Sequence, residues 1–169
     1  MSFCRWSVMV VLWGLHVSCQ KQPALVQSFS KIVVGSVNSN HDNNDGTAQL
    51  LRTMPTIPVM ESIMVCTKKG EARLTAAMKK AEQLLQEKHQ QYQQKFPHAQ
   101  VMSTAISKVQ NVQRGQSQGD CIVSRDFDLV HINVLIQYSY DSVREVYLQL
   151  DTLYIDSRYY LLDIHDHDG

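Results

Sequence analysis

The stretch Cys121–Tyr138, CIVSRDFDLVHINVLIQY, constrains the fold more than any other part of the chain. In its second half, one face carries mainly β-branched residues: Val130, Ile132, Val134, Ile136 and Tyr138. The alternate positions carry Leu129, His131, Asn133, Leu135 and Gln137. A period of two with one apolar face is typical of a half-buried strand. At about 3.3 Å per residue such a strand crosses a whole domain, so we expect it to be the central strand of a sheet.

Composition limits the classes of protein to which the chain can belong. Hydrophobic residues make up 44% of the sequence, which is normal for a folded globular domain. The 16 basic residues are balanced by 16 acidic ones, so no basic excess favours a nucleic-acid partner. The length fits one domain of ordinary size.

The first 19 residues have the three parts of an export signal. Arg5 supplies a positive charge, Val8–Val17 an apolar core, and Ser18 and Cys19 the small residues at the cut. The apolar run is about ten residues, which is short for a bilayer core of roughly 30 Å.

The end of this segment, Leu15–Cys19, resembles the lipobox of bacterial lipoproteins, with Val17 and Ser18 in register and Leu15 one place early. The resemblance implies that Cys19 is acylated and becomes the mature N-terminus. Gln20 after it would direct the protein to the outer membrane, on its periplasmic face. Two alternatives stay open: cleavage after Cys19 that releases a soluble secreted protein, or a retained anchor. All three place the domain outside the cytoplasm.

The cysteine count fits this location. Cys4 and Cys19 lie in the signal, which leaves Cys66 and Cys121 as an even pair in an oxidising compartment. We expect a disulfide between them, with two separate buried thiols as the alternative.

The mature chain begins with a polar segment, 20–30, that we interpret as a tether. A strand is predicted at Lys31–Val37, followed by the loop 38–46, rich in Asn, Asp and Gly. Residues 47–54 are ambiguous and fit a short helical turn. An apolar strand is predicted at Val59–Cys66.

A helix is predicted at Glu71–Phe96, because apolar residues recur every three or four positions. Pro97 ends it. Ala99–Gln110 favours a strand, although its apolar residues also fit a helix. A second helix is predicted at 142–154, since Ser142 and Glu145 have the spacing of a capping box. A last strand is predicted at Arg158–Ile164, and residues 166–169 are predicted to form a polar tail.

From Val59 onward the predicted order is β-α-β-β-α-β, which resembles the ferredoxin-like two-layer sandwich. The predicted fold is therefore a single α+β domain, 31–165, with an extra N-terminal strand. In the ferredoxin-like fold the first and third strands are adjacent and antiparallel, which implies that Cys66 lies beside Cys121. A disulfide closing a loop of this length stabilises by about 4 kcal/mol in the chain-entropy model.

Candidate sites are few. His165 and His167 share one face if the last strand continues, and such a pair occurs in divalent-metal sites; the alternative is a solvated tail. His131 is a candidate base on the sheet face opposite the helices, or simply a surface histidine. Apolar residues on that face favour burial against the strand at 31–37, another subunit or a partner: Val123, Phe127, Leu129 and Leu135.

No P-loop, dinucleotide-binding, nucleophile-elbow or zinc-protease motif is present, so we expect neither an enzyme nor a cofactor. The sequence favours an exported envelope lipoprotein, held to the membrane by its lipid and acting as an accessory or interaction module. In size and layout it is similar to small lipoproteins of secretion, pilus and conjugation assemblies. A secreted or periplasmic ligand- or metal-binding domain is the alternative, and an enzyme without a recognisable motif is a third.

Overall fold

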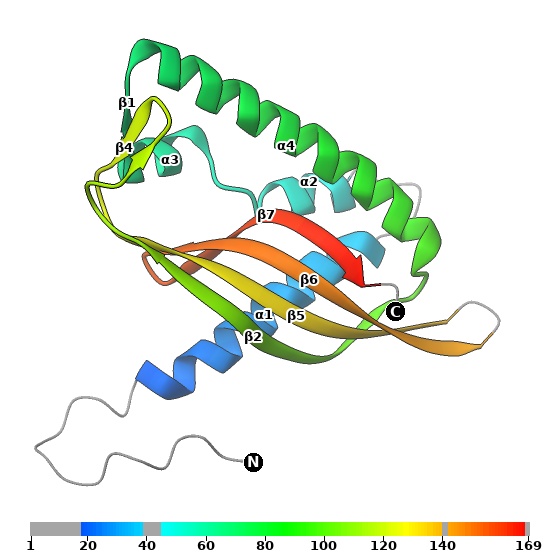
Figure 1. Cartoon of the computed structure of the whole chain (residues 1–169). Helices are drawn as coiled ribbons and strands as arrows, with labels where there is room; N and C mark the ends of the chain where they lie inside the picture. The colour runs from blue at the N-terminus through cyan, green and yellow to red at the C-terminus, as the bar shows by residue number, and fades with distance from the viewer. Residues whose placement is uncertain (1–17, 39–44, 140–141, 168–169) are drawn as a thin grey trace, which may run out of the picture.

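The computed structural model describes residues 18–38, 45–139 and 142–167, and within them the side chains of residues 24–37, 46–139 and 142–166. Helices and antiparallel strands occur together in this part of the chain, which confirms the predicted α+β class. The main sheet has the strand order β2 (Gln100–Val112), β5 (Phe127–Ser139), β6 (Val143–Ile155), β7 (Arg158–His167) (Figure 1). All neighbouring strands in it are antiparallel.

The predicted central strand lies inside this sheet, between β2 and β6. Its apolar face is buried, with Val130, Ile132, Val134 and Ile136 at most 3% exposed. We call this side of the sheet the inner face and the opposite side, which carries His131, the outer face. The stretch Cys121–Tyr138 is divided, however, because the chain leaves the strand conformation at 124–126 between β4 (Cys121–Val123) and β5.

Helix α1 (Ser18–Asn38) covers part of the inner face, which corrects two predictions. Segment 20–30 is not a tether and Lys31–Val37 is not a strand, because both belong to this helix. Its buried apolar residues recur at helical spacing: Val26, Phe29, Val33, Val34 and Val37. β-branched valines favour strands, but the apolar stripe that the helix buries against the sheet outweighs this small preference.

Helix α4 (Lys68–Lys95) confirms the predicted long helix. The Thr67 hydroxyl caps its start by accepting from Gly70 N at 3.2 Å. Its large buried side chains, Leu85, His89 and Tyr92, lie in its C-terminal half, and Phe96, which follows the helix, is buried beside them. His89 Nε2 donates to the Ser36 carbonyl at 2.9 Å, while Nδ1 lies 3.1 Å from Thr47 Oγ1 in α2 (Asp45–Leu51). Helices α1, α2 and α4 therefore meet at one buried imidazole.

A second core covers one end of the outer face. Helix α3 (Ile57–Ile63), strand β1 (Met64–Cys66) and strand β4 contribute to it. Phe127 and Leu129, predicted to need a cover, pack here with Leu153 and Ile63. The cover is thus α3, and not the segment 31–37.

The predicted strand Val59–Cys66 is largely helical, and only Met64–Cys66 is extended. Pro58 lies in the first turn of α3. N–H groups there have no partner within the helix, so the lack of one in proline costs no hydrogen bond, and the fixed φ of proline favours the helix. A proline at this place is a start signal for a helix, which outweighs the apolar character of the segment.

The predicted helix 142–154 is wrong, since these residues form β6. Glu145 does not cap a helix but lies opposite Gln137 of β5. The apolar residues of the segment fit both the helical period and the strand period of two. Val143, Val146, Leu150 and Leu153 have helical spacing. Leu148, Leu150 and Thr152 alternate as in a strand, and all three are buried. Pairing with both β5 and β7 selects the strand. The observed order of elements is therefore not ferredoxin-like.

The disulfide between Cys66 and Cys121 is present, and it closes a separation of 55 residues. Their Cα atoms are 4.0 Å apart, since the two cysteines are antiparallel partners in β1 and β4. These strands form a small sheet with β3 (Ser117–Gln118), apart from the main sheet. The neighbour relation that the ferredoxin-like resemblance implied holds, although the fold around it differs.

The C-terminal boundary also differs from the prediction. Strand β7 continues to His167 instead of ending at Ile164, and Asp166 contacts Lys95 and Tyr92 of α4. Asp166 is thus part of the domain and not of a polar tail. Among the described helices, none combines the length and apolar character that crossing a membrane requires.

Candidate functional site

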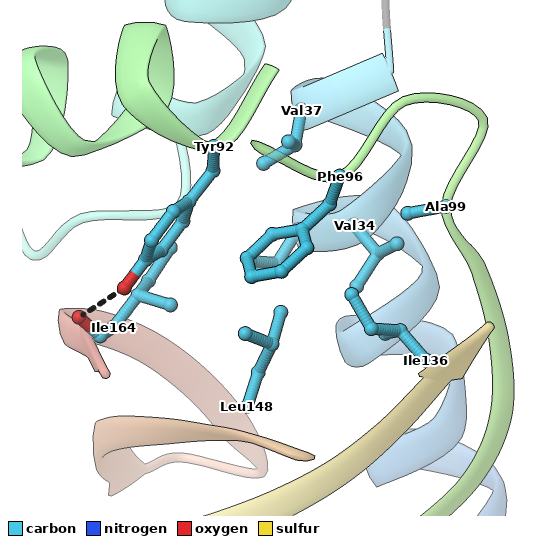
Figure 2. A pocket seen from close by; sticks show the side chains of 9 residues that line it. Val34, Val37, Tyr92, Phe96, Ala99, Ile136, Leu148 and Ile164 are labelled. Atoms are coloured by element: carbon cyan, nitrogen blue, oxygen red, sulfur yellow. Dashed lines mark hydrogen bonds between the residues drawn. The ribbon is translucent and has the colours of Figure 1, made fainter. Parts of the chain in front are cut away.

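The interior of the domain contains a small apolar cavity between α1, the end of α4 and the sheet (Figure 2). Its volume is about 10 Å³, which is room for about one water molecule. Phe96 and Leu148 point into it, and the Tyr92 hydroxyl beside it donates to the Ile164 carbonyl at 3.4 Å. This cavity is too small for a substrate or a cofactor.

Two hollows larger than this cavity lie at the surface along the N-terminal half of α4. One hollow of about 460 Å³ separates α4 from the connection between α2 and α3. A second, of about 270 Å³, lies between α4, α3 and β1. Ile57 and Thr75 line both hollows, so the two lie side by side. We call them together the α4 groove; its remaining lining residues are Leu51, Met54, Pro55, Thr56, Glu61, Met64, Val65, Cys66, Glu71, Leu74, Met78, Lys79 and Glu82.

One face of α4 forms a whole wall of the groove. The α4 residues that line it recur every three or four positions, which is the spacing of one helix face: Glu71, Leu74, Thr75, Met78, Lys79 and Glu82. The sequence predicted that Leu74 and Met78 continue the buried stripe of this helix. They are only half-buried, because the part of α4 that packs in the main core begins near Leu85.

The lining is apolar with a charged rim. Among the lining methionines, Met54 is buried, while Met64 and Met78 are half-buried. Methionine side chains are flexible and polarizable, and they are used at surfaces that adapt to a bound partner. The rim carries three carboxylates and one ammonium group: Glu61, Glu71, Glu82 and Lys79.

The disulfide fixes one end of the groove. Cys66 lines it, and Cys121 and Asp120 lie against Gly70 at the start of α4. Arg73, on the next turn, pairs with the Asp120 carboxylate. The N-terminal turns of α4 are therefore held by β1 and β4, which keeps the groove wall in place without support from the main sheet.

A polar network on the outer face contains two of the histidines named from the sequence. His131 Nδ1 donates to Asp151 Oδ1 at 2.6 Å, since a carboxylate can only accept. Gln149 Nε2 donates to the same oxygen at 2.8 Å, and His165 Nε2 lies 3.2 Å from Asp151 Oδ2. Nε2 of His165 is also 3.3 Å from Asp163 Oδ2. Three adjacent strands thus contribute to one network.

Burial acts to raise the pKa of Asp151, but other effects outweigh it. Hydrogen bonds from Gln149 and His131, and the positive charges of His131 and His165, hold the pKa below its ordinary value. Asp151 therefore stays ionised and orients both imidazoles.

This network does not supply the predicted metal site. Within the described residues no group of three or more His, Cys, Asp or Glu side chains is placed to hold a metal ion. His165 instead contacts the two aspartates, and the side chain of His167 lies outside the described part. Hydrogen bonds within the described residues join Nδ1 of the His131 ring to Asp151 and Gln149, which orients the ring as a base would be oriented. Sequence reasoning missed Asp151 and Gln149, which it had assigned to a helix.

The predicted lipidation site is outside what the structure tests. The backbone of Cys19 belongs to α1, while its side chain and the signal residues 1–17 lie outside the described part. Acylation of Cys19 stays a prediction.

Comparison with protein-family models, curated proteins and solved structures finds no match for this chain.

Proposed function

We propose that this chain is an exported cell-envelope lipoprotein, anchored through Cys19, that acts as a small accessory module by binding another protein in the α4 groove. The observation that carries the proposal is the groove itself. It runs along one face of α4 and is lined mainly by apolar residues, whereas the internal cavity has room for about one water molecule.

Two features support a location outside the cytoplasm. The first 19 residues have the parts of an export signal. The mature domain joins Cys66 to Cys121, and disulfides of this structural kind form and persist in oxidising compartments. The disulfide holds a wall of the groove, so an oxidising compartment also suits the proposed site.

The shape of the groove favours a protein segment over a small molecule. Sites for small molecules enclose most of the ligand surface and place a few polar groups to orient it. The charged residues that line the α4 groove are all exposed to solvent, unlike the buried polar groups that orient a small ligand. An open apolar groove along a helix is a common way to bind a segment of another protein.

The first experiment is the intact mass of the protein purified from its native membrane fraction. We expect a chain that begins at Cys19, carries acyl chains, and lacks the two hydrogens removed by the disulfide. A non-acylated chain beginning at Gln20 in the soluble fraction would exclude the lipoprotein and favour a secreted binding protein.

Partner binding is tested by a photo-crosslinking amino acid at Thr75, in the middle of the groove. We expect one discrete adduct in the envelope fraction. The same amino acid at Leu84, which is exposed on α4 outside the groove lining, is the matched control. If both positions give the same adducts, or neither gives one, the groove is not the binding site.

A further inference from the structure

We propose that the segment bound in the α4 groove is an amphipathic helix of the partner, with apolar side chains in the hollow beside Met78 and a basic end between Glu61 and Glu71. This inference rests on the proposed function, because it names the chemistry of the partner at the same site.

The groove has the length of a short helix. Its α4 wall runs from Glu71 to Glu82, which is about 16 Å at 1.5 Å per residue. A partner helix of about three turns covers the same length and presents one side chain or two per turn to the wall. Such a helix lying in an apolar groove is an established mode of peptide recognition.

The walls do not suit an extended peptide that adds a strand. Strand addition needs the free backbone groups of a sheet edge. The only strand that lines the groove among the described elements is β1, which lies at the edge of the small sheet but has only three residues. It offers few backbone groups to an added strand, and the rest of the lining comes from helices and the connection between α2 and α3, which suits a helix better.

The two ends of the groove differ in polarity. In the larger hollow, Met54, Met78 and Ile57 form an apolar lining, and the charges of Lys79 and Glu82 offset each other. In the smaller hollow, Glu61 and Glu71 face the groove without a basic lining residue. Neither carboxylate has an ion pair within the described part of the chain.

Charge complementarity therefore gives the bound helix a direction. Lys or Arg at one end of the partner segment would lie near Glu61 and Glu71, and the apolar stripe would fill the larger hollow. Lys68 and Lys69 are exposed on the same turn as Glu71 but do not line the groove. Complementary rim charges mainly raise the association rate and fix the orientation of a complex, so their effect depends on salt.

Two synthetic peptides test the proposal against the full mature protein. Both are fluorescein-labelled helical 14-mers with the same leucine stripe, and they differ only in carrying three Lys or three Glu at one end. Fluorescence anisotropy measures Kd at low salt and at high salt. We expect the Lys-ended peptide to bind about tenfold more tightly at low salt, with a smaller difference at high salt.

Variants assign the binding to the groove. Met78→Glu should weaken the Lys-ended peptide at least about tenfold, because it places a charge in the apolar hollow. Leu84→Glu on the same helix is the matched control and should leave Kd unchanged. The double variant Glu61→Lys/Glu71→Lys should reverse the preference to the Glu-ended peptide. Thermal melting confirms that each variant is folded before its Kd is compared.

Four results would overturn the proposal. The first is no binding of either peptide, and the second is binding that Met78→Glu leaves unchanged. The third is tight competition by a peptide of residues 1–17, which would identify the chain's own segment as occupant. The fourth is a dimer in sedimentation that Met78→Glu dissociates, which would identify a second copy. If the peptides fail while crosslinking from Thr75 still yields a partner, the interaction function stands and only the helix chemistry is wrong.

Discussion

The carbonyl oxygen of Asp120 lies 2.7 Å from the point that a Cβ atom at Gly70 would occupy. Cys66 Cβ and Cys121 Sγ lie 3.1 Å from the same point. The first turn of α4 therefore approaches β4 and the disulfide at a distance that only glycine permits. This contact sets the position of the helix wall that forms the α4 groove.

Gly70→Ala should destabilise the protein by about 1–3 kcal/mol, because backbone and disulfide atoms must shift to admit a methyl group. Urea unfolding at neutral pH measures the change. The control is Gly35→Ala in α1, where nothing lies within 4 Å of the added Cβ. That variant should be neutral or more stable by up to about 1 kcal/mol, since alanine favours helix. Equal losses in the two variants would contradict the close approach at Gly70.

Removing the disulfide with Cys66→Ala/Cys121→Ala should cost about 4 kcal/mol, as the chain-entropy model gives for a 55-residue separation. Reduction of the wild-type protein should cause a similar loss in denaturant unfolding. The double variant should be insensitive to reductant. A variant as stable as the oxidised wild type would show that the bond does not restrain the unfolded chain.

His89→Leu should destabilise by about 1–3 kcal/mol, because the buried Ser36 carbonyl loses its imidazole donor and the half-buried Thr47 hydroxyl loses its contact with Nδ1. Gln90→Leu, on the exposed side of the same turn, is the control and should change stability by less than about 0.5 kcal/mol. Hydrogen exchange of α1 amides provides an independent measurement. Unchanged protection in His89→Leu would contradict a linking role for this side chain.

Asp151→Asn should change how stability depends on pH. The folded protein holds the pKa of Asp151 below its ordinary value, so the ionised carboxylate contributes stability above the unfolded pKa of about 3.9. That contribution is lost as pH falls below about 4 and through the lower folded pKa.

The test is urea unfolding of wild type and Asp151→Asn between pH 7 and pH 3. The wild type should be more stable at pH 7, and the difference should shrink below about pH 4. Asp166, whose pKa is also held low because hydrogen bonding and charge from Lys95 outweigh burial, titrates in the same direction in both proteins. A difference that stays constant down to pH 3 would contradict the proposed role of Asp151.

Sequence patterns were sufficient where residues favour a single structure. Good helix formers, an apolar stripe and Pro97 predicted α4, and clean alternation predicted β5. The pairing of Cys66 with Cys121 also followed, because only two cysteines remained after the signal. In these cases each local preference agrees with the tertiary environment.

Other segments satisfy two periods at once, and only tertiary contacts decide between them. Residues 31–37 are rich in β-branched residues but bury a helical stripe, while the segment of β6 has helical spacing but pairs on both sides with strands. Intrinsic preferences amount to a few tenths of a kcal/mol per residue, which is less than the burial of one valine or leucine side chain.

The candidate site, too, could be predicted only in part from the sequence. The sequence alone determined that Leu74 and Met78 lie on the apolar face of a helix. Only the tertiary structure decided that this part of α4 lies outside the main core, so that its apolar face lines an open groove. It also brought Asp151 of β6 to His131 of β5 and His165 of β7. Spacing along one element shows which residues share a face, whereas what lies opposite that face depends on segments distant in the sequence.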